Sequence, residues 1–363
     1  MCGATMQSKN PTIAIRAGEE LDLPTLDSVL KQIVPNLAGY PVVTQFPSGA
    51  SNLTYLICYS NRELVLRRPP FGLKAAGAHS MAREYQVIYA LREVYPSVPE
   101  AIFYTDDETF LGSEFYLMEK VEGVLVADRF PANWNFKAAD YKQFCQVVFD
   151  KLIELHQVNV SAAGLSTFGR PKGYAGRQIE GWNKRFNNAA TPDVQRFEDV
   201  QEWLQANLPA EDGCQPPTAL MHGDYRIDNV MLDPIDPFSV VAVLDWEMAA
   251  LGDPLMDLSN ALAYWVHADD PPVLRSILKQ PSDVPGMMRR EEIIAYYGET
   301  TQYDMSHWGF YEVYGYWRLV GMMQQLHYRY VNKHSRDSRF ANYAEAINNL
   351  GDQCRQLIAK STL

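Results

Sequence analysis

Cysteine is scarce in this chain of 363 residues, and its distribution argues against a disulfide framework or a zinc cluster. The cysteines are odd in number, widely spaced and without a C-x-x-C pair, which is typical of reduced thiols. We expect them to be buried and inert. They are Cys2, Cys58, Cys145, Cys214 and Cys354.

Long apolar runs and an excess of positive charge are also missing. No uninterrupted apolar run approaches the roughly 18 residues of a membrane span, and the N-terminus lacks the basic-then-apolar pattern of a secretion signal. The formal charge of −12 argues against non-specific binding to nucleic acid or anionic membranes, which favour clustered Lys and Arg. The sequence therefore predicts a cytoplasmic protein with no nucleic-acid or membrane partner, although a local basic patch could still bind an anionic ligand.

The composition is that of a folded protein. Hydrophobic residues make up 47% of the chain, aromatic residues 12% and charged residues 21%, far from the composition of disordered proteins. Because 363 residues exceed the usual size of a single core, two packed lobes are expected.

The first third of the chain alternates short β-type segments with helices. Two segments have apolar residues at helical spacing, and five others are short, rich in Val, Leu, Ile and Tyr, and separated by turn residues. These segments predict antiparallel hairpins around a helix. The predicted helices are 21–37 and 78–94, and the predicted strands are Tyr40–Phe46, Leu53–Tyr59, Glu63–Arg67, Ala101–Thr105 and Phe115–Lys120.

After Gly123 helical spacing dominates, and one short β island interrupts it. The pattern predicts an α+β protein with a small antiparallel-sheet lobe at residues 1–119 and a larger helical lobe at 120–363, joined by a hinge near Glu119 to Gly123. The β island comprises Ala219–Met221, Val230–Leu232 and Val240–Leu244. The predicted helices are Tyr141–Val158, Arg177–Asn187, Val194–Asn207, Pro254–Val266, Arg289–Tyr297, His307–Tyr330 and Ala341–Ile358.

The segment with the most chemical information is residues 222–229, which read HGDYRIDN. Asp245 follows sixteen residues after Asn229, in the sequence VLDWE. Together they place a potential base, Asp224, and two oxygen-donor metal ligands beside β-type apolar residues, which is the minimum equipment for moving a phosphoryl group with Mg²⁺. Each part alone is a weak signal, whereas the combination is uncommon. The sequence therefore favours a phosphotransferase.

This combination resembles the catalytic core of the protein-kinase-like superfamily, and specifically the aminoglycoside phosphotransferase family. In kinases the catalytic loop reads H-R-D-x-x-x-x-N, and a later D-F-G aspartate holds Mg²⁺. The resemblance implies a bilobal protein-kinase-like fold with ATP and Mg²⁺ as cofactors. It also implies that Asp224 accepts the proton of a substrate hydroxyl, while Asn229 and Asp245 hold magnesium.

Two departures from the kinase pattern follow Asp245. Trp246 and Glu247 replace the Phe-Gly of D-F-G, and the resulting Asp-Trp-Glu is common in small-molecule phosphotransferases. Downstream, Asp253 is expected to cap a helix that begins at Pro254, and in this family Asp253 and Asp257 are expected to brace the metal loop rather than contact substrate.

The other polar residues of the catalytic loop have competing interpretations. Arg226 lies two residues after Asp224, where protein kinases often have Lys, so it is a candidate to neutralise the γ-phosphate. A surface salt bridge is the alternative for Arg226. We expect Asp228 to be a turn carboxylate and His222 to anchor the loop.

The first lobe is expected to cover ATP. Ser48, Gly49, Ser51 and Asn52 belong to a run of small residues between two predicted strands, where backbone N–H groups can approach phosphates closely. An ordinary hairpin turn is the alternative. Near the end of the first lobe, the strand leading into Glu119 and Val121 resembles the segment whose backbone grips adenine.

A cation is expected at the end of the third strand. The resemblance places Arg67 where a kinase presents its phosphate-binding Lys, and it supplies Glu84 of the following helix as the partner that orients this cation. Arg68 is the alternative phosphate contact, and Arg does not substitute freely for Lys.

The acceptor is less closely defined. VLRRPP at residues 65–70, the His-x-x-x-Arg-Glu pattern at residues 79–84 and the catalytic loop most resemble phosphotransferase domains fused to some acyl-CoA dehydrogenases. That branch is associated with hydroxyacyl-CoA, notably 4-hydroxyacyl-CoA, so the implied partner is a small-molecule hydroxyl acceptor that includes acyl-CoA.

Charge does not decide between the possible acceptors. Aminoglycosides are polycations and need an acidic cleft, which the net charge of −12 permits. CoA is a polyanion and needs Lys or Arg, for which candidates are present. The aromatic-rich segment 311–318 either lines the acceptor site or belongs to the core. The candidate cations are Lys172, Arg177, Arg318 and Arg329.

Two further functional classes remain open. A nucleotide-binding pseudokinase is favoured by Arg67 in place of Lys, and disfavoured by the joint presence of Asp224, Asn229 and Asp245. A metal-dependent hydrolase is disfavoured because the few histidines are not spaced as a ligand cluster.

Overall fold

A computed structural model describes residues 12–47, 52–70, 80–209, 218–334 and 337–361. The chain divides into two compact units, each of which contains segments that are distant in sequence. Unit 1 comprises Met1–Leu125, Ser161–Leu165 and Asn229–Ala249, and unit 2 comprises Val126–Val160, Ser166–Asp228 and Ala250–Leu363. The predicted lobe boundary between residues 119 and 120 stays a prediction.

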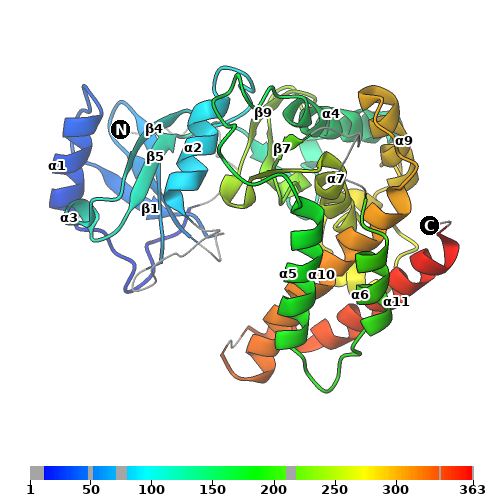
Figure 1. Ribbon diagram of the computed structural model, residues 1–363. Helices are drawn as coiled ribbons and strands as arrows, with labels where there is room; N and C mark the ends of the chain where they lie inside the picture. Colours follow the sequence, from blue (N-terminus) through cyan, green and yellow to red (C-terminus); the bar gives the residue numbers. More distant parts are fainter. Residues whose placement is uncertain (1–11, 48–51, 71–79, 210–217, 335–336, 362–363) are drawn as a thin grey trace. The chain divides into compact units, whose positions relative to one another are not determined.

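Unit 1 is built on an antiparallel sheet of five strands in the order β1-β2-β3-β5-β4 (Figure 1). Its strands alternate side chains between two faces, as the period of a β-strand requires. The strands are β1 (Val42–Gln45), β2 (Leu53–Cys58), β3 (Glu63–Arg68), β4 (Ala101–Thr105) and β5 (Phe115–Glu119).

A helix lies on each face of this sheet. α1 (Leu23–Ile33) supplies Leu26 and Leu30 to a core that also contains Tyr55 and Leu66 from one sheet face. α2 (Met81–Leu91) packs against β4 and β5, and its face of the sheet carries the alternate residues of β3. The short helix α3 (Glu108–Leu111) contacts α1.

A second sheet of unit 1 has three strands in the order β6-β8-β9. Because β8 and β9 are antiparallel, with Val230 opposite Val243, the residues just before β8 and just after β9 lie next to each other. The backbone N–H of Leu244 accordingly donates to the carbonyl of Asn229 at 2.8 Å. The strands are β6 (Val124–Leu125), β8 (Val230–Leu232) and β9 (Val240–Val243), with short 3₁₀ turns at Ile227–Asn229 and Trp246–Met248.

Unit 2 is mainly helical, and the long helix α10 is its centre (Figure 1). α10 contacts α5, α6, α7 and α11, and most of its residues are buried. The helices are α4 (Ala138–His156), α5 (Tyr174–Asn188), α6 (Glu198–Ala206), α7 (Pro254–Ala263), α8 (Pro272–Leu278), α9 (Arg290–Thr301), α10 (Trp308–Val331) and α11 (Tyr343–Lys360). Further 3₁₀ turns are Ala132–Trp134, Pro281–Asp283 and Ser338–Asn342, and a two-stranded sheet pairs β7 (Ala219–Met221) with β10 (Ala250–Gly252).

Helices α7 and α10 approach each other closely at a glycine. A Cβ atom added at Gly315 of α10 would lie 2.4 Å from the carbonyl oxygen of Ser259 in α7. Carbon and oxygen atoms do not approach so closely, so this position requires a residue without a side chain. α7 itself begins where the sequence predicts, with Pro254 at its first position and the Asp253 carboxylate accepting from the N–H of Leu255 at 2.9 Å.

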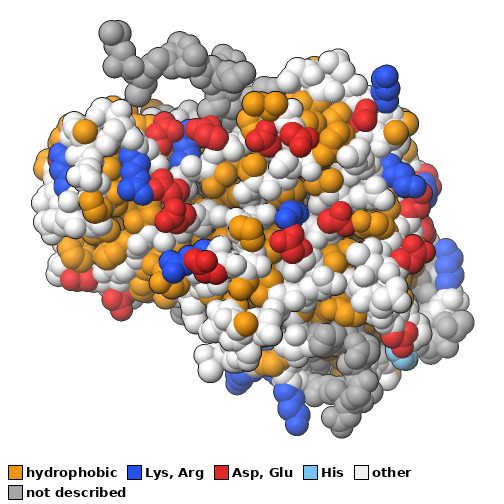
Figure 2. Space-filling model, turned by 90° about the horizontal axis from the view of Figure 1, so that it is seen from above, with side chains coloured by type: hydrophobic (Ala, Val, Ile, Leu, Met, Phe, Trp, Pro, Cys, Tyr) orange, Lys and Arg blue, Asp and Glu red, His pale blue; other side chains and the backbone are white. Residues whose placement is uncertain are grey.

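The long predicted elements are present with shifts of a few residues at their ends. On the face shown in Figure 2, acidic and basic side chains are interspersed rather than collected by sign. Within the described ranges, no helix combines the length and the apolar character that crossing a bilayer requires.

Candidate active site

The central residue of the site in unit 1 is Arg67, on β3. Alternation along β3 directs Arg67 away from the face of Leu64 and Leu66 and toward α2. Its guanidinium contacts Glu84 of α2 at 2.5 Å (Nη1 to Oε1) and Asp245 at 3.1 Å (Nη2 to Oδ1). The side chain of Arg67 is 11% exposed and that of Glu84 is 1% exposed, so this ion pair is buried.

Burial and opposite charges act against each other in this cluster. Burial alone would lower the pKa of Arg67, but the carboxylates of Glu84, Asp245 and Glu247 around it raise that pKa above its ordinary value. Burial also raises the pKa of Glu84 to about 7, although the Arg67 guanidinium opposes the shift. Arg67 is therefore a permanent cation in a pocket of carboxylates.

A second polar pair extends the cluster and was not predicted. The side-chain amide of Asn52, just before β2, donates to Glu247 Oε2 at 2.8 Å. The same oxygen of Glu247 lies 3.9 Å from Nη2 of Arg67. The signal available in the sequence was the Glu that replaces Gly after Asp245, but its partner is 195 positions away in the chain.

Asp245 occupies an uncommon backbone conformation. Its φ of 68° lies in the left-handed region, which residues other than glycine seldom adopt. The following Trp246 fixes the turn, because its indole N–H donates to the carbonyl of Val243 at 2.8 Å and its ring meets that of Tyr95 edge-on at 6.0 Å. The Asp245 side chain remains 36% exposed, so a carboxylate oxygen is accessible to a ligand.

Asn229 and Asp245 fit a magnesium ion by their chemistry and position. Strand pairing brings the backbone of Asn229 next to Leu244, the residue before Asp245. Their side chains offer carboxylate and amide oxygens, which are ligands that Mg²⁺ accepts, together with water and phosphate oxygens. Among the described residues no cluster of three His, Cys, Asp or Glu side chains could hold a metal by itself. A metal here would depend on nucleotide phosphates for its remaining ligands.

The other predicted nucleotide contacts are placed as follows. Arg68 is buried and donates to the carbonyl of Leu111 at 3.0 Å, so Arg67 rather than Arg68 contacts Glu84. Glu119 ends β5, where its N–H donates to the carbonyl of Glu100 at 3.0 Å and its carboxylate pairs with Arg62. Val121 lies in the segment between β5 and β6. Ser48, Gly49 and Ser51 lie outside the described residues.

The catalytic loop of unit 2 is held by its backbone. The carboxylate of Asp257, in the first turn of α7, accepts from the N–H of His222 at 2.7 Å and from the N–H of Gly223 at 2.8 Å. The carbonyl of Gly223 in turn accepts from Nη2 of Arg318 in α10 at 2.6 Å. Gly223 has a φ of 83°, a conformation that glycine adopts without strain. The peptide groups on both sides of Gly223 are thus fixed.

Asp257 is supported by a further buried residue that sequence analysis did not single out. His156 of α4 contacts Asp257 through Nε2 at 3.1 Å and the hydroxyl of Tyr297 through Nδ1 at 2.6 Å. Burial would raise the pKa of Asp257, but the hydrogen bond from His156 and that from the N–H of Gly223 outweigh it and lower the pKa. A charged carboxylate is therefore stable at this buried position.

Of the remaining loop residues, some are buried and anchor the loop, and others are partly exposed. The ring of His222 is fully buried, and its Nδ1 accepts from the N–H of Asp224 at 3.3 Å. Asp224 itself is half-buried. Arg226 donates to Asp228 at 2.9 Å (Nε to Oδ1) and lies over the ring of Tyr264, 4.8 Å from its centre. The salt bridge weighed as the alternative for Arg226 is thus present, and its predicted catalytic role stays a prediction.

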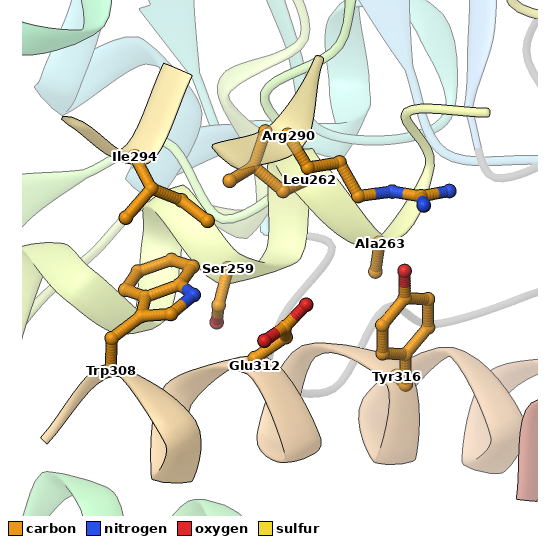
Figure 3. A pocket seen from close by; sticks show the side chains of 8 residues that line it. All are labelled: Ser259, Leu262, Ala263, Arg290, Ile294, Trp308, Glu312 and Tyr316. Atoms are coloured by element: carbon orange, nitrogen blue, oxygen red, sulfur yellow. The ribbon is translucent and has the colours of Figure 1, made fainter. Parts of the chain in front are cut away.

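Two cavities of the structure lie away from these residues. A cavity of about 10 Å³ between α7, α9 and α10 admits at most one water molecule, and Figure 3 shows Trp308, Glu312 and Tyr316 extending from α10 toward α7 around it. A groove of about 470 Å³ lies in unit 1 along the exposed side of α2, beside Tyr89 and residues 162–165. The predicted aromatic segment 311–318 is mostly buried, in agreement with its core alternative.

The family of the chain follows from its sequence. The model of the phosphotransferase enzyme family matches residues 42–293, more than half of the chain. The chain belongs to this family. The predicted family is therefore confirmed. Asp224, Asn229 and Asp245 lie within the matched range.

The curated relatives of this chain are longer than the chain itself. It is 31% identical over 348 residues to acyl-CoA dehydrogenase family member 11 of Homo sapiens, with 92% of this chain and 43% of that protein covered. The chain thus spans less than half the length of the curated relatives it matches. The resemblance to phosphotransferase domains of this branch is confirmed.

Solved structures confirm the fold of the phosphotransferase. A putative aminoglycoside phosphotransferase from Ralstonia eutropha superposes with a TM-score of 0.81 at 26% identity, over 95% of this chain and all of that one. An aminoglycoside phosphotransferase in ternary complex with AMP-PNP and hygromycin B superposes with a TM-score of 0.55 at 16% identity, over 93% and 99% of the two chains. The predicted α+β, kinase-like fold is confirmed, and the second likeness shows the fold alone.

Proposed function

We propose that this phosphotransferase moves the γ-phosphoryl group of Mg²⁺-bound ATP to a hydroxyl group of a small molecule, in the cytoplasm. The observation that carries the proposal is the Arg67 cluster, in which one buried guanidinium contacts both Glu84 and the accessible carboxylate of Asp245. A buried cation beside a candidate metal ligand is suited to the phosphates of a nucleotide.

Each proposed residue has a distinct role in this reaction. Arg67 binds the α- and β-phosphates of ATP and is oriented by Glu84. Asn229 and Asp245 would hold Mg²⁺, which neutralises charge on the phosphates when it is bound. Backbone groups of Glu119 and Val121 contact adenine, and Ser48, Gly49, Ser51 and Asn52 belong to the phosphate-covering turn. The proposed lobes are residues 1–119 and 120–363.

Asp224 is proposed as the group that receives the proton of the acceptor hydroxyl. Its position in the loop is fixed by Asp257 and Arg318, which hold the backbone of the preceding Gly223. A base that is held next to the attacking oxygen lowers the entropic cost of reaching a reactive geometry. Arg226 is proposed to neutralise charge on the transferred group, although it also pairs with Asp228.

The acceptor that we propose first is a hydroxyacyl-CoA, including 4-hydroxyacyl-CoA. Support comes from the relatives, which are named as members of the acyl-CoA dehydrogenase family. An aminoglycoside, amino-alcohol or sugar is the second candidate, because solved proteins of the same fold are named as aminoglycoside phosphotransferases and one contains hygromycin B. A pseudokinase that binds ATP without transferring phosphate is the third.

The proposal is tested by separating nucleotide binding from transfer. Mg²⁺-ATP should raise the melting temperature of the protein, and ATP consumption should depend on an added hydroxyl compound. Asp224→Ala should abolish consumption while keeping the thermal shift, whereas Asp245→Ala should abolish the Mg²⁺-dependent part of the shift. Asp128→Asn, which removes an exposed carboxylate, is the control that should change neither.

Two results would count against the proposal. Absence of any thermal shift with Mg²⁺-ATP removes the nucleotide assignment. Equal turnover by the wild type and Asp224→Ala removes Asp224 as the base. A thermal shift without consumption on any of hydroxyacyl-CoAs, aminoglycosides, amino-alcohols and sugars favours the pseudokinase.

A further inference from the structure

The guanidinium of Arg318 in unit 2 is buried. Arg318 of α10 is 4% exposed, and its guanidinium donates to the carbonyl of Gly223. Throughout the described ranges no carboxylate lies within ion-pair distance of it. Because isolated buried charges are costly, proteins generally pair such groups or leave them for a charged ligand.

A second guanidinium shares its aromatic surface. The carbon of the Arg318 guanidinium lies 5.6 Å from the ring centre of Trp182 in α5, and that of Arg185 lies 4.2 Å from the same ring. Arg185 is exposed, and in the described part of the chain it also has no ion pair or hydrogen bond to an acid. Trp182 is 6% exposed and therefore fixed in place between its neighbours.

The surroundings do not neutralise these two charges. Partial burial, together with the nearby charge of Arg318, lowers the pKa of Arg185. The phenols that face Arg318 include Tyr264 and Tyr314, and burial raises the pKa of each to about 12. These phenols are therefore uncharged near neutral pH. The carboxylate of Asp224 also acts electrostatically on Arg318, although the two form no ion pair in the described part of the chain.

We infer that Arg318 and Arg185, around Trp182, receive a negatively charged group of the acceptor, so that the acceptor is an anionic hydroxyl compound. This inference rests on the proposed function, because it assigns the molecule that takes the phosphoryl group. A guanidinium matches a carboxylate or a phosphate through parallel N–H donors. A polycationic aminoglycoside would meet two like charges at the same place, which disfavours its binding.

The contact of Arg318 with the loop determines where the negative group of the acceptor lies. Arg318 binds the carbonyl of Gly223, the residue immediately before Asp224. An anionic group on Arg318 therefore lies close to the loop that carries the proposed base. The negative group then lies either next to the reacting hydroxyl, as the carboxylate of a hydroxy acid does, or at the end of a flexible arm that folds back toward the loop, as the phosphates of a hydroxyacyl-CoA do.

The first test compares acceptors of different charge, three of which share a four-carbon hydroxyl chain. We would measure kcat/KM for 4-hydroxybutyrate, 4-hydroxybutyryl-CoA, the neutral 1,4-butanediol and the cationic kanamycin. At least one of the two anionic compounds should exceed both others by about tenfold or more, the factor that corresponds to ~1.4 kcal/mol. The better of the two anions identifies a carboxylate or a CoA ester as the source of charge. Equal or better turnover of 1,4-butanediol or kanamycin overturns the inference.

The second test removes one charge without disturbing the loop. Arg185→Gln should raise KM for the preferred anionic acceptor about tenfold and leave KM for ATP unchanged. Lys184→Gln, which removes the neighbouring exposed cation, is the matched control and should stay within about twofold of the wild type. An unchanged KM for the anionic acceptor in Arg185→Gln contradicts the assignment.

Binding without transfer separates this inference from the proposed function. Calorimetry with 4-hydroxybutyryl-CoA and with 4-hydroxybutyrate, in the absence of ATP, should detect an anion whose affinity falls in Arg185→Gln and not in Lys184→Gln. Such binding supports the anion site even if Mg²⁺-ATP fails to bind and the proposed function is lost. Transfer to neutral acceptors, with no anion binding by calorimetry, leaves the proposed function standing and overturns the inference.

Discussion

At the scale of single residues, Arg67 is the most constrained side chain of unit 1. It is 11% exposed and lies within reach of three carboxylates, of which Glu84 is the most deeply buried. Arg67→Met should weaken Mg²⁺-ATP binding by at least about tenfold, because the proposed phosphate contact is lost. Arg67→Lys should retain part of the affinity, since it keeps the charge but loses the planar fork. Isothermal calorimetry with Mg²⁺-ATP measures both, and wild-type affinity in Arg67→Met contradicts the role.

Glu84 should give the folding free energy a recognisable pH dependence. A carboxyl whose pKa is raised on folding, here to about 7, binds its proton more tightly in the folded chain than in the unfolded chain. Its contribution to stability is therefore present below its unfolded pKa and is lost as the pH rises through about 7. Relative to Glu84→Gln, the free energy of unfolding of the wild type should fall between about pH 5 and pH 8 in urea titrations without nucleotide. Glu93→Gln, whose carboxylate is exposed just after the same helix, should run parallel to the wild type.

Several of these residue-scale contacts could be predicted and others could not. The Arg67–Glu84 ion pair was expected from the resemblance to kinases, and it is present. The contact of Asn52 with Glu247 joins residues 195 positions apart, which no local pattern reports. The left-handed backbone of Asp245 was equally hidden, because glycine is the usual signal for that conformation.

At the scale of elements, α7 and α4 hold the catalytic loop through Asp257 and His156. Asp257→Asn should lower kcat strongly and the free energy of unfolding by about 2–4 kcal/mol, because an amide cannot accept at both N–H groups and His156 loses its partner. Asp270→Asn, which removes the buried partner of Arg290, is a control for lost stability away from the loop. Denaturant unfolding and steady-state kinetics measure the two effects, and an unchanged kcat in a folded Asp257→Asn protein contradicts the anchoring role.

The length of an element decided in part whether it could be predicted from the sequence. Long helices such as α4 and α10 have several turns of apolar periodicity, so their existence was predictable and their ends shifted by a few residues. α3, α8, β6 and β10, which have four, seven, two and three residues, were missed, whereas β7 and β8, with three residues each, were predicted. Elements this short form through their neighbours rather than through a periodic pattern of their own.

At the scale of the whole molecule, the expectation of inert thiols can be checked by chemistry. Cys145 and Cys354 are buried, and burial raises the pKa of Cys145 to about 12 and that of Cys354 above its ordinary value. Cys58 is half-buried. Iodoacetamide at neutral pH should therefore modify Cys58 before the other two in the native protein, and all three should react in urea. Peptide mass spectrometry gives the order, and early labelling of Cys145 contradicts the packing of unit 2.

The relation of this chain to its relatives also belongs to this scale. The alignment with the human relative covers 92% of this chain but 43% of that protein, which is named as a member of the acyl-CoA dehydrogenase family. Family and fold could be predicted because the loop and metal motifs lie within one continuous stretch of sequence. Of the two guanidiniums that carry the inference, Arg318 was among the candidate cations, whereas Arg185 was not, because α5 and α10 are far apart in sequence and no motif joins them.

The absence of a side chain at Gly315 sets the distance between α7 and α10, and the position of the loop at residues 222–224 depends on that distance. Three residues along α10, Arg318 holds the carbonyl of Gly223, and two residues before Ser259 on α7, Asp257 holds the N–H of the same glycine. The distance between the two helices is thus set where Gly315 meets Ser259, and there is no room for a side chain between them at that point. Any added bulk at that crossing would push the two helices apart and displace the peptide groups on both sides of Gly223.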